Sequence, residues 1–259
     1  MKRALVTGAA RRLGRSMALS LAEHGYDVAV HYAHSHEDAG ETVDEIRALG
    51  GVAEALPADL LNESEMAQLV PHAAEALGGP LSVLINNASI FERDTIESAT
   101  RTSWDRHMDS NLRAPFVLTQ SFAAQAPDPL MDGEGEPLAQ ALVINMIDQR
   151  VRRLTPDFMS YTLAKSALWT LTQTAAQALA PRIRVNAIGP GPTLRGERQT
   201  AEQFARQRQA TILQRGADED DITAALSYLL NARSVTGQMI AVDGGQHLSW
   251  QTPDVMGVE

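Results

Sequence analysis

Two side chains near the middle of the chain have the types and the spacing needed to transfer a proton. Tyr161 and Lys165 are four residues apart, so on a helix they share one face. An ammonium beside a phenol favours the phenolate, which predicts a lowered pKa for Tyr161 and a role as general acid in a reduction. The chain has twenty arginines but only two lysines, Lys2 and Lys165. The alternative is a solvated pair on an amphipathic helix.

A third candidate, Asp148, lies thirteen residues before Tyr161 and directly after an apolar run. A partly buried carboxyl group can retain a proton or pass one through a neighbouring phenol. The same residue could instead cap the loop after a strand. We favour the chemical interpretation, because Tyr161 and Lys165 follow on the next predicted helix.

Strands and helices alternate along the chain, and the strands are apolar runs without a period of two. Both features indicate a doubly wound α/β fold, in which a seven-stranded parallel sheet has helices on both faces and ligands bind at the carboxyl ends of the strands. The expected strands are residues 4–7, 27–32, 52–57, 81–85, 141–146, 183–188 and 239–242. The expected helices are one that starts at residue 13 and those at residues 37–49, 63–77, 104–124, 158–179, 202–212 and 219–230.

No domain boundary is evident, so residues 1–259 are expected to form a single domain. Residues 126–137 are rich in proline, glycine and acids, which predicts an exposed loop. A loop and helix at residues 193–212 are expected beside the substrate, and residues 251–259 are expected to form a polar tail.

Composition excludes several classes of function. The net charge of −10 argues against nucleic-acid binding, which needs a basic face. The chain has no cysteine, so disulfides, thiolate catalysis and cysteine metal sites are excluded. No metal site is expected, since His31, His34 and His36 are more typical of polar surface or ligand contact. No window is long and apolar enough for a membrane span or signal peptide, which predicts a cytoplasmic protein without membrane contact.

A glycine turn after the first strand predicts an anion site. Gly8 and Gly14 flank the start of a helix, where unpaired N–H groups and the helix dipole attract phosphate. The end of the second strand has no acid for ribose hydroxyls, but His34 and Ser35 are there, and Arg12 is in the turn. Such donors suit a 2′-phosphate and predict NADPH as cofactor. The alternative is that Arg11 and Arg12 are solvated; at a helix start they oppose the dipole, which favours an anion between them.

The whole series of motifs resembles the short-chain dehydrogenase/reductases, which have a Rossmann-type fold. The matches are the turn at residues 7–14, Asp59-Leu60, Asn86-Asn87-Ala88, Asn111, Tyr161 with Lys165, and Pro190-Gly191. The resemblance implies a catalytic set of Asn111, Asp148, Tyr161 and Lys165. It implies a cofactor site of Gly8, Arg12, Leu13, Gly14, His34, Ser35, Asp59, Leu60, Asn87, Ala88, Ser89, Tyr161, Lys165, Pro190, Gly191 and Thr193.

Two departures resemble the pteridine reductase branch of that superfamily, which includes dihydromonapterin and dihydrofolate reductase-like members. Arg12 stands where the usual turn has a glycine, and Asp148 stands where the usual catalytic residue is serine. The branch implies that Phe91 stacks on a pterin and that Ser89, Asp148 and Tyr161 also contact the substrate. It also implies that Lys165 binds the nicotinamide ribose and that Asn111 orders a water.

The resulting hypothesis is NADPH-dependent reduction of a C=N bond in a pterin or folate. A carboxylate at Asp148 would repel a developing alkoxide, but it suits a ring nitrogen that gains a proton. The first alternative is a carbonyl or 3-oxoacyl reductase of the same superfamily, and the second is a nucleotide-sensing protein without catalysis. The resemblance also implies a homotetramer with the two long helices at its interfaces; Trp169 could lie there or in the core.

Overall fold

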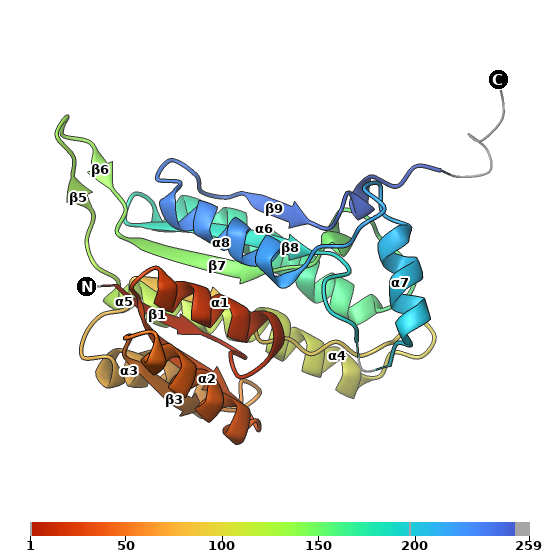
Figure 1. Cartoon of the computed structure of the whole chain (residues 1–259), viewed down its shortest axis with the longest axis horizontal. Helices are drawn as coiled ribbons and strands as arrows, with labels where there is room; N and C mark the ends of the chain where they lie inside the picture. Colours follow the sequence, from red (N-terminus) through yellow and green to blue (C-terminus); the bar gives the residue numbers. More distant parts are fainter. Residues whose placement is uncertain (1, 197, 252–259) are drawn as a thin grey trace.

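The structure is a computed structural model that describes residues 2–196 and 198–251. One sheet contains seven parallel strands in the order β3-β2-β1-β4-β7-β8-β9, which confirms the predicted fold (Figure 1). The strands of this sheet are β1 Arg3–Val6, β2 Asp27–Tyr32, β3 Ala53–Pro57, β4 Val83–Asn86, β7 Ala141–Met146, β8 Ile183–Pro190 and β9 Met239–Val242. The α-helices are α1 Arg12–Glu23, α2 His36–Ala48, α3 Glu63–Ala76, α4 Arg101–Met108, α5 Ala114–Gln125, α6 Met159–Leu179, α7 Ala201–Gln209 and α8 Glu219–Asn231.

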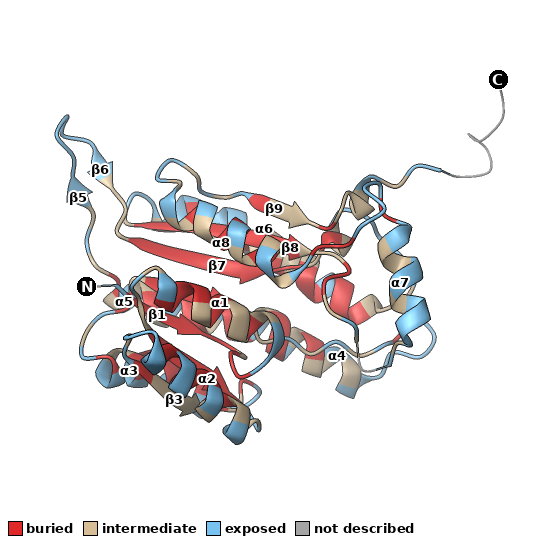
Figure 2. Ribbon diagram, viewed as in Figure 1, coloured by how far each residue is buried: buried red, intermediate tan, exposed pale blue. Residues whose placement is uncertain are grey.

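Helices cover both faces of the sheet, so the inner strands are buried, whereas the edge strands β3 and β9 are mostly of intermediate exposure (Figure 2). Successive side chains of a strand point to opposite faces. Ala4 and Val6 of β1 therefore pack in a core with α1, α2 and α8, whereas Leu5 packs in a second core with α3, α5 and α6. The strand order reverses between β1 and β4, which is where ligands bind in doubly wound sheets.

The helix predicted at residues 104–124 is interrupted. The structure has α4, then a π-helical turn at Asp109–Arg113, then α5. Pro115 has no N–H to donate to the carbonyl of Asn111, so the regular hydrogen-bond ladder cannot pass this point. The turn contains the candidate residue Asn111.

The segment at residues 126–137, which was predicted to be an exposed loop, contains two short strands, and residues 130–137 are exposed. Strands β5 Leu130–Met131 and β6 Pro137–Leu138 form an antiparallel hairpin that projects from the body (Figure 1). Asp132 stabilises its turn, because its Oδ1 accepts from the amides of Glu134 and Glu136, both at 2.9 Å. Of the predicted tail, residues 252–259 lie outside the described residues. Within the described part of the chain, none of the helices has the length and apolar character of a transmembrane segment.

Candidate active site

The carboxyl ends of β1, β2, β3, β4, β7 and β8 surround one pocket of about 710 Å³. Most of the residues predicted from the sequence line it: Gly8, Arg12, Leu13, Gly14, His34, Asp59, Leu60, Asn87, Ala88, Ser89, Phe91, Asp148, Tyr161, Lys165, Pro190, Gly191 and Thr193. Two predicted residues are not in its lining, Ser35 and Asn111. Ser35 is the N-cap of α2, and Asn111 is fully buried behind the pocket wall.

The turn after β1 is shaped by its two glycines. Gly8 has φ +62°, a conformation that residues with a Cβ rarely adopt. A Cβ on Gly14 would lie 2.1 Å from the carbonyl oxygen of Gly8 and 2.6 Å from Nδ2 of Asn87. The close approach brings the N-terminus of α1 against the end of β4, so backbone N–H groups face the pocket where a diphosphate would bind.

Both arginines of this turn have partners within the protein. Nε of Arg11 donates to Asp38 at 2.7 Å, while the guanidinium of Arg12 donates to the carbonyls of Leu194 and Arg195 at 3.3 and 3.0 Å. These contacts give both side chains acceptors inside the protein, and the expectation of an anion between them stays a prediction. Arg12 has φ 55°, the left-handed region, at the position where the family's usual turn has glycine.

His31, at the end of β2, contacts the same turn through the amide of Gly8. Its Nδ1 accepts from the Gly8 amide at 3.0 Å, so its Nε2 carries the hydrogen and donates to the carbonyl of Ala58 at 3.0 Å. Burial lowers its pKa to about 4, so the ring is neutral at pH 7. His31 was expected at a polar surface or against a ligand; it is buried at the pocket and supports the turn, which its place at a strand end beside Gly8 could have indicated.

Asp148, Tyr161 and Lys165 converge at the end of β7. Oη of Tyr161 donates to Oδ2 of Asp148 at 3.1 Å, and Oδ1 of Asp148 accepts from the Arg150 amide at 2.8 Å. Nζ of Lys165 donates to the carbonyl of Met146 at 2.8 Å. Asp148 thus caps the turn after the strand and also contacts the phenol, so both of its predicted alternatives describe real contacts.

The predicted lowering of the Tyr161 pKa is wrong for this structure. Burial, the charge of Asp148 and the hydrogen bond to Asp148 together raise the pKa of Tyr161 well above its usual value. Burial also raises the pKa of Asp148, and it lowers that of Lys165 to about 8. The sequence pattern suggested the lysine as the main influence on this pKa, but burial has the largest effect, followed by the charge and the hydrogen bond of Asp148. The phenol consequently retains its proton.

Residues 89–94, which we call the aromatic loop, follow β4, and Ser89, Ile90 and Phe91 of this loop line the pocket. The side chain of Asn111 accepts from the amide of Ile90 at 2.9 Å and donates to its carbonyl at 2.8 Å. Asn111 thus fixes this loop, and its ordering of a water stays a prediction. Phe91 is 49% exposed and stacks on Phe158, with centroids 4.3 Å apart and planes 2° apart. Its edge contact with Tyr161, at 4.7 Å, brings the candidate stacking ring beside the candidate proton donor.

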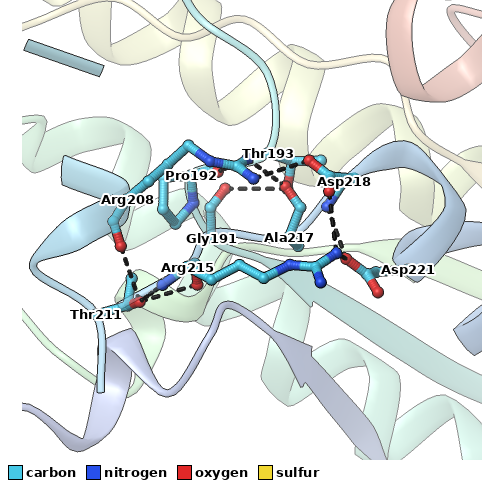
Figure 3. A network of polar contacts seen from close by, with 9 residues as sticks. All are labelled: Gly191, Pro192, Thr193, Arg208, Thr211, Arg215, Ala217, Asp218 and Asp221. Carbon is cyan, nitrogen blue, oxygen red and sulfur yellow. Dashed lines mark hydrogen bonds and ion pairs between the residues drawn. The ribbon is translucent and has the colours of Figure 1, made fainter. Parts of the chain in front are cut away.

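The loop and helix after Gly191 are fastened to the pocket by Arg208 of α7 (Figure 3). Its guanidinium donates to the carbonyls of Pro192 and Ala217 at 3.2 and 2.6 Å, and to Asp218 at 2.8 Å. The single hydroxyl hydrogen of Thr211 has two acceptors at 2.9 Å, the carbonyls of Arg208 and Arg215, and its oxygen accepts from the Arg215 amide at 3.1 Å. These contacts connect α7 with the turn at Pro190-Gly191, which lines the cofactor side of the pocket.

Comparison with known proteins agrees with this geometry. The family model described as enoyl-(acyl carrier protein) reductase matches residues 8–247. A 3-oxoacyl-[acyl-carrier-protein] reductase FabG of Staphylococcus aureus is 33% identical over 252 residues, 95% of this chain and 98% of the relative.

Two solved structures represent different chemistries. FolM alternative dihydrofolate reductase 1 from Brucella suis, in complex with NADP, is 44% identical with a TM-score of 0.90, covering 98% of each chain. The landomycin C-6 ketoreductase LanV, with bound NADP and rabelomycin, is 30% identical with a TM-score of 0.83, covering 96% of this chain and 97% of the other. With a matching family model, these relatives and the convergent site, the chain belongs to the short-chain dehydrogenase/reductase superfamily and is an oxidoreductase.

Proposed function

We propose that the protein is an NADPH-dependent reductase of a C=N bond in a pterin or folate ring. The observation that carries this proposal is the contact of Asp148 with Tyr161, in which the phenol donates to the carboxyl group at 3.1 Å. A ketone substrate would develop an alkoxide beside this carboxylate and be repelled. A ring nitrogen that gains a proton is favoured at the same place. The 44% identical FolM structure supports the same substrate class.

The pocket fits NADPH. The glycine turn gives close backbone approach and a helix N-terminus for the diphosphate, and the residues directly after β2, Ala33 to Ser35, include no acid to repel a 2′-phosphate. The FolM structures from two Brucella species contain NADP. Arg12, His34 and Ser35 are the proposed donors to the 2′-phosphate. When bound, NADPH supplies the hydride.

The chain's own residues supply the proton. Tyr161 keeps its proton at neutral pH and donates it to the ring nitrogen, while the adjacent ring carbon gains the hydride. The phenolate left by this step regains a proton from solvent through Asp148: burial raises the pKa of this carboxylate, which favours proton uptake, and its hydrogen bond to Tyr161 provides the path to the phenol. The ammonium of Lys165 donates one N–H to the carbonyl of Met146, and its other two N–H groups can donate to the ribose hydroxyls. Phe91 offers a flat apolar surface to the substrate ring.

The proposal is tested by NADPH oxidation with dihydrobiopterin, dihydromonapterin, dihydrofolate and a simple ketone. We expect turnover of at least one pterin or folate and slow reduction of the ketone. Asp148→Asn should lower that turnover by ~100-fold or more, with NADPH affinity retained. Asp148→Ser, which introduces the family's usual residue, should shift the preference towards the ketone. Full pterin turnover in Asp148→Asn would refute the role of the carboxylate.

A second candidate function is reduction of a 3-oxoacyl or other carbonyl group. The 33% identity to FabG over nearly the whole chain supports it. Asp148 argues against it, because the carboxylate stands where an alkoxide would form. Ketone or 3-oxoacyl turnover that exceeds pterin turnover in the wild-type enzyme would favour this candidate.

We also propose a homotetramer in the cytoplasm, as the family resemblance implies. Trp104 of α4, Phe116 of α5 and Leu163 of α6 are 41%, 39% and 43% exposed, which leaves apolar surface on these helices. Trp169 is partly buried against Leu168 and Ile147, so it contributes to a small core. Light scattering coupled to size exclusion should give four times the chain mass of 28.0 kDa; a monomer mass would contradict the assembly.

A further inference from the structure

A buried chain of three polar side chains lies behind the substrate wall. Asp94, His107 and Ser160 come from the aromatic loop, α4 and the start of α6, and they are 3%, 0% and 0% exposed. Nδ1 of His107 is 2.6 Å from Oγ of Ser160, which in turn makes a short hydrogen bond to Oδ2 of Asp94. Three segments that are distant in sequence are therefore joined at one point.

The direction of every hydrogen bond in this chain is determined. The amide of Glu92 donates to Nε2 of His107 at 3.1 Å, so that nitrogen is an acceptor and Nδ1 carries the hydrogen. Nδ1–H must then donate to Ser160, and the Ser160 hydroxyl donates to Asp94. His107 is accordingly neutral, in agreement with the burial that lowers its pKa. The serine lies between the other two groups and is fully buried, which differs from a nucleophilic triad, where histidine occupies the middle.

The hydrogen bonds of Asp94, His107 and Ser160 connect the aromatic loop with the start of α6, the two segments proposed to contact the substrate. Glu92 and Asp94 follow Phe91 in the aromatic loop, and Ser160 precedes Tyr161. The amide of Ser160 also donates to Oδ1 of Asp94 at 3.1 Å, which anchors the first turn of α6. Phe158, just before this helix, has φ 59° and stacks on Phe91, so the joined segments already place a residue in an unfavourable conformation to make that contact.

We propose that His107 is a positioning residue that sets the geometry between the stacking ring of Phe91 and the phenol of Tyr161. Its acceptor nitrogen fixes the aromatic loop through Glu92, and its donor nitrogen fixes the start of α6 through Ser160. Because the two contacts use different atoms, His107 influences substrate affinity through the first and proton transfer through the second. The proposal rests on the proposed function in taking Phe91 as the surface on which the substrate ring stacks and Tyr161 as the proton donor.

Two conservative variants separate the contacts. Gln at position 107 can accept from the Glu92 amide, as Nε2 does, but it loses the donor to Ser160; Asn can keep the donor and loses the acceptor. We expect His107→Gln to lower kcat with KM retained, and His107→Asn to raise the substrate KM ~10-fold with kcat nearly retained. NADPH affinity should stay within twofold in both. His72→Gln, on an exposed histidine of α3, is the matched control.

A double-mutant cycle tests whether His107 acts through the stacking ring. His107→Asn and Phe91→Ala should each raise KM, and the double variant should have the KM of Phe91→Ala alone, because the loop then has no ring to position. Additive effects on KM would overturn the proposal. Parallel loss of NADPH affinity in the His107 variants would also overturn it, since that result indicates general damage to the fold.

Hydrogen exchange gives a readout that needs no substrate. Peptides covering residues 89–96 should exchange at least ~10-fold faster in His107→Asn than in His107→Gln, while peptides from β7 stay protected in both. Equal exchange rates in the two variants would refute the claim that Nε2 of His107 holds the aromatic loop through the Glu92 amide. If wild-type protein reduces no pterin or folate, the proposed function fails, and the exchange experiment still decides the role of His107.

Discussion

The cofactor half and the substrate half of the pocket are built by different means. Residues 8–14 and the ends of β2 and β3 form the half proposed for the cofactor, and backbone shapes it: Gly8 has φ +62°, and Gly14 lies close to the Gly8 carbonyl. Side chains line the half proposed for the substrate: Phe91 of the aromatic loop after β4, Asp148 after β7, and Tyr161 of α6. Side-chain contacts across these segments, rather than local backbone geometry, determine the shape of that wall. Changes in the first half should therefore alter cofactor binding, and changes in the second should alter turnover.

Removal of the proton donor is expected to give the largest effect and to leave the cofactor half intact. Tyr161→Phe should lower kcat by ~10²- to 10⁴-fold, because the hydroxyl is the group that protonates the substrate. NADPH affinity, measured by fluorescence titration, should remain within a few-fold of wild type. Tyr228→Phe is the control, since Tyr228 is 55% exposed on α8. Equal loss of NADPH affinity would show that the halves are not separable.

Acid is expected to weaken the cofactor half through His31. The folded-state pKa of about 4 lies below the ordinary value of 6.5, so the folded protein binds fewer protons than the unfolded chain between these values. This contribution to stability is present above pH 6.5 and is lost as the pH falls towards 4, by ~3 kcal/mol in total. Urea unfolding from pH 7 to 4.5 should show the decline. In His31→Asn the decline should be smaller; an unchanged slope would assign it to other groups.

Crowding of the glycine turn should affect binding more than chemistry. Gly14→Ala places a Cβ 2.1 Å from the Gly8 carbonyl, which must move the start of α1. We expect a loss of ~1–3 kcal/mol of stability and a fall of ~10- to 100-fold in NADPH affinity. At saturating NADPH, kcat should recover most of its value. Gly40→Ala is the matched control, because a Cβ at that helical position meets nothing within 4 Å. Similar losses in both variants would contradict the role of the close approach.

The same difference explains which features were predictable from the sequence. The sheet and the cofactor half follow from local signals, such as apolar runs, the turn at Gly8 and the missing acid after β2. Asp148, Tyr161 and Lys165 were found by type and spacing, but the direction of the Tyr161 pKa depended on which neighbour contacts the phenol. His107, Asp94 and Phe158 lie in three segments that meet only in the folded protein, so no local pattern connected them.

The π-helical turn and the hairpin show a second limit. Periodicity predicted one helix across residues 104–124, yet a single missing N–H at Pro115 changes the ladder and thereby places Asn111 against Ile90. The acidic and glycine-rich composition of residues 126–137 predicted a loop, and the hairpin arises because Asp132 accepts two amides in its turn. In both segments, the contacts of one residue determined the local structure more than the average composition did.

Arg12 does not fit the separation into a cofactor half and a substrate half. It belongs to the glycine turn, but it donates hydrogen bonds to the loop after Thr193, which is expected beside the substrate. Its φ of 55° costs about 1 kcal/mol relative to glycine, and its contacts with Leu194 and Arg195 offset that cost. Arg12→Gly should therefore leave the melting temperature nearly unchanged while it reduces the preference for NADPH over NADH ~5-fold. Gln214→Gly, at the other left-handed site near α7, relieves the same strain without these contacts and should raise the melting temperature slightly. If Arg12→Gly keeps the full preference for NADPH, then Arg12 stabilises only the loop at Leu194 and Arg195. Binding of the 2′-phosphate would then depend on His34 and Ser35.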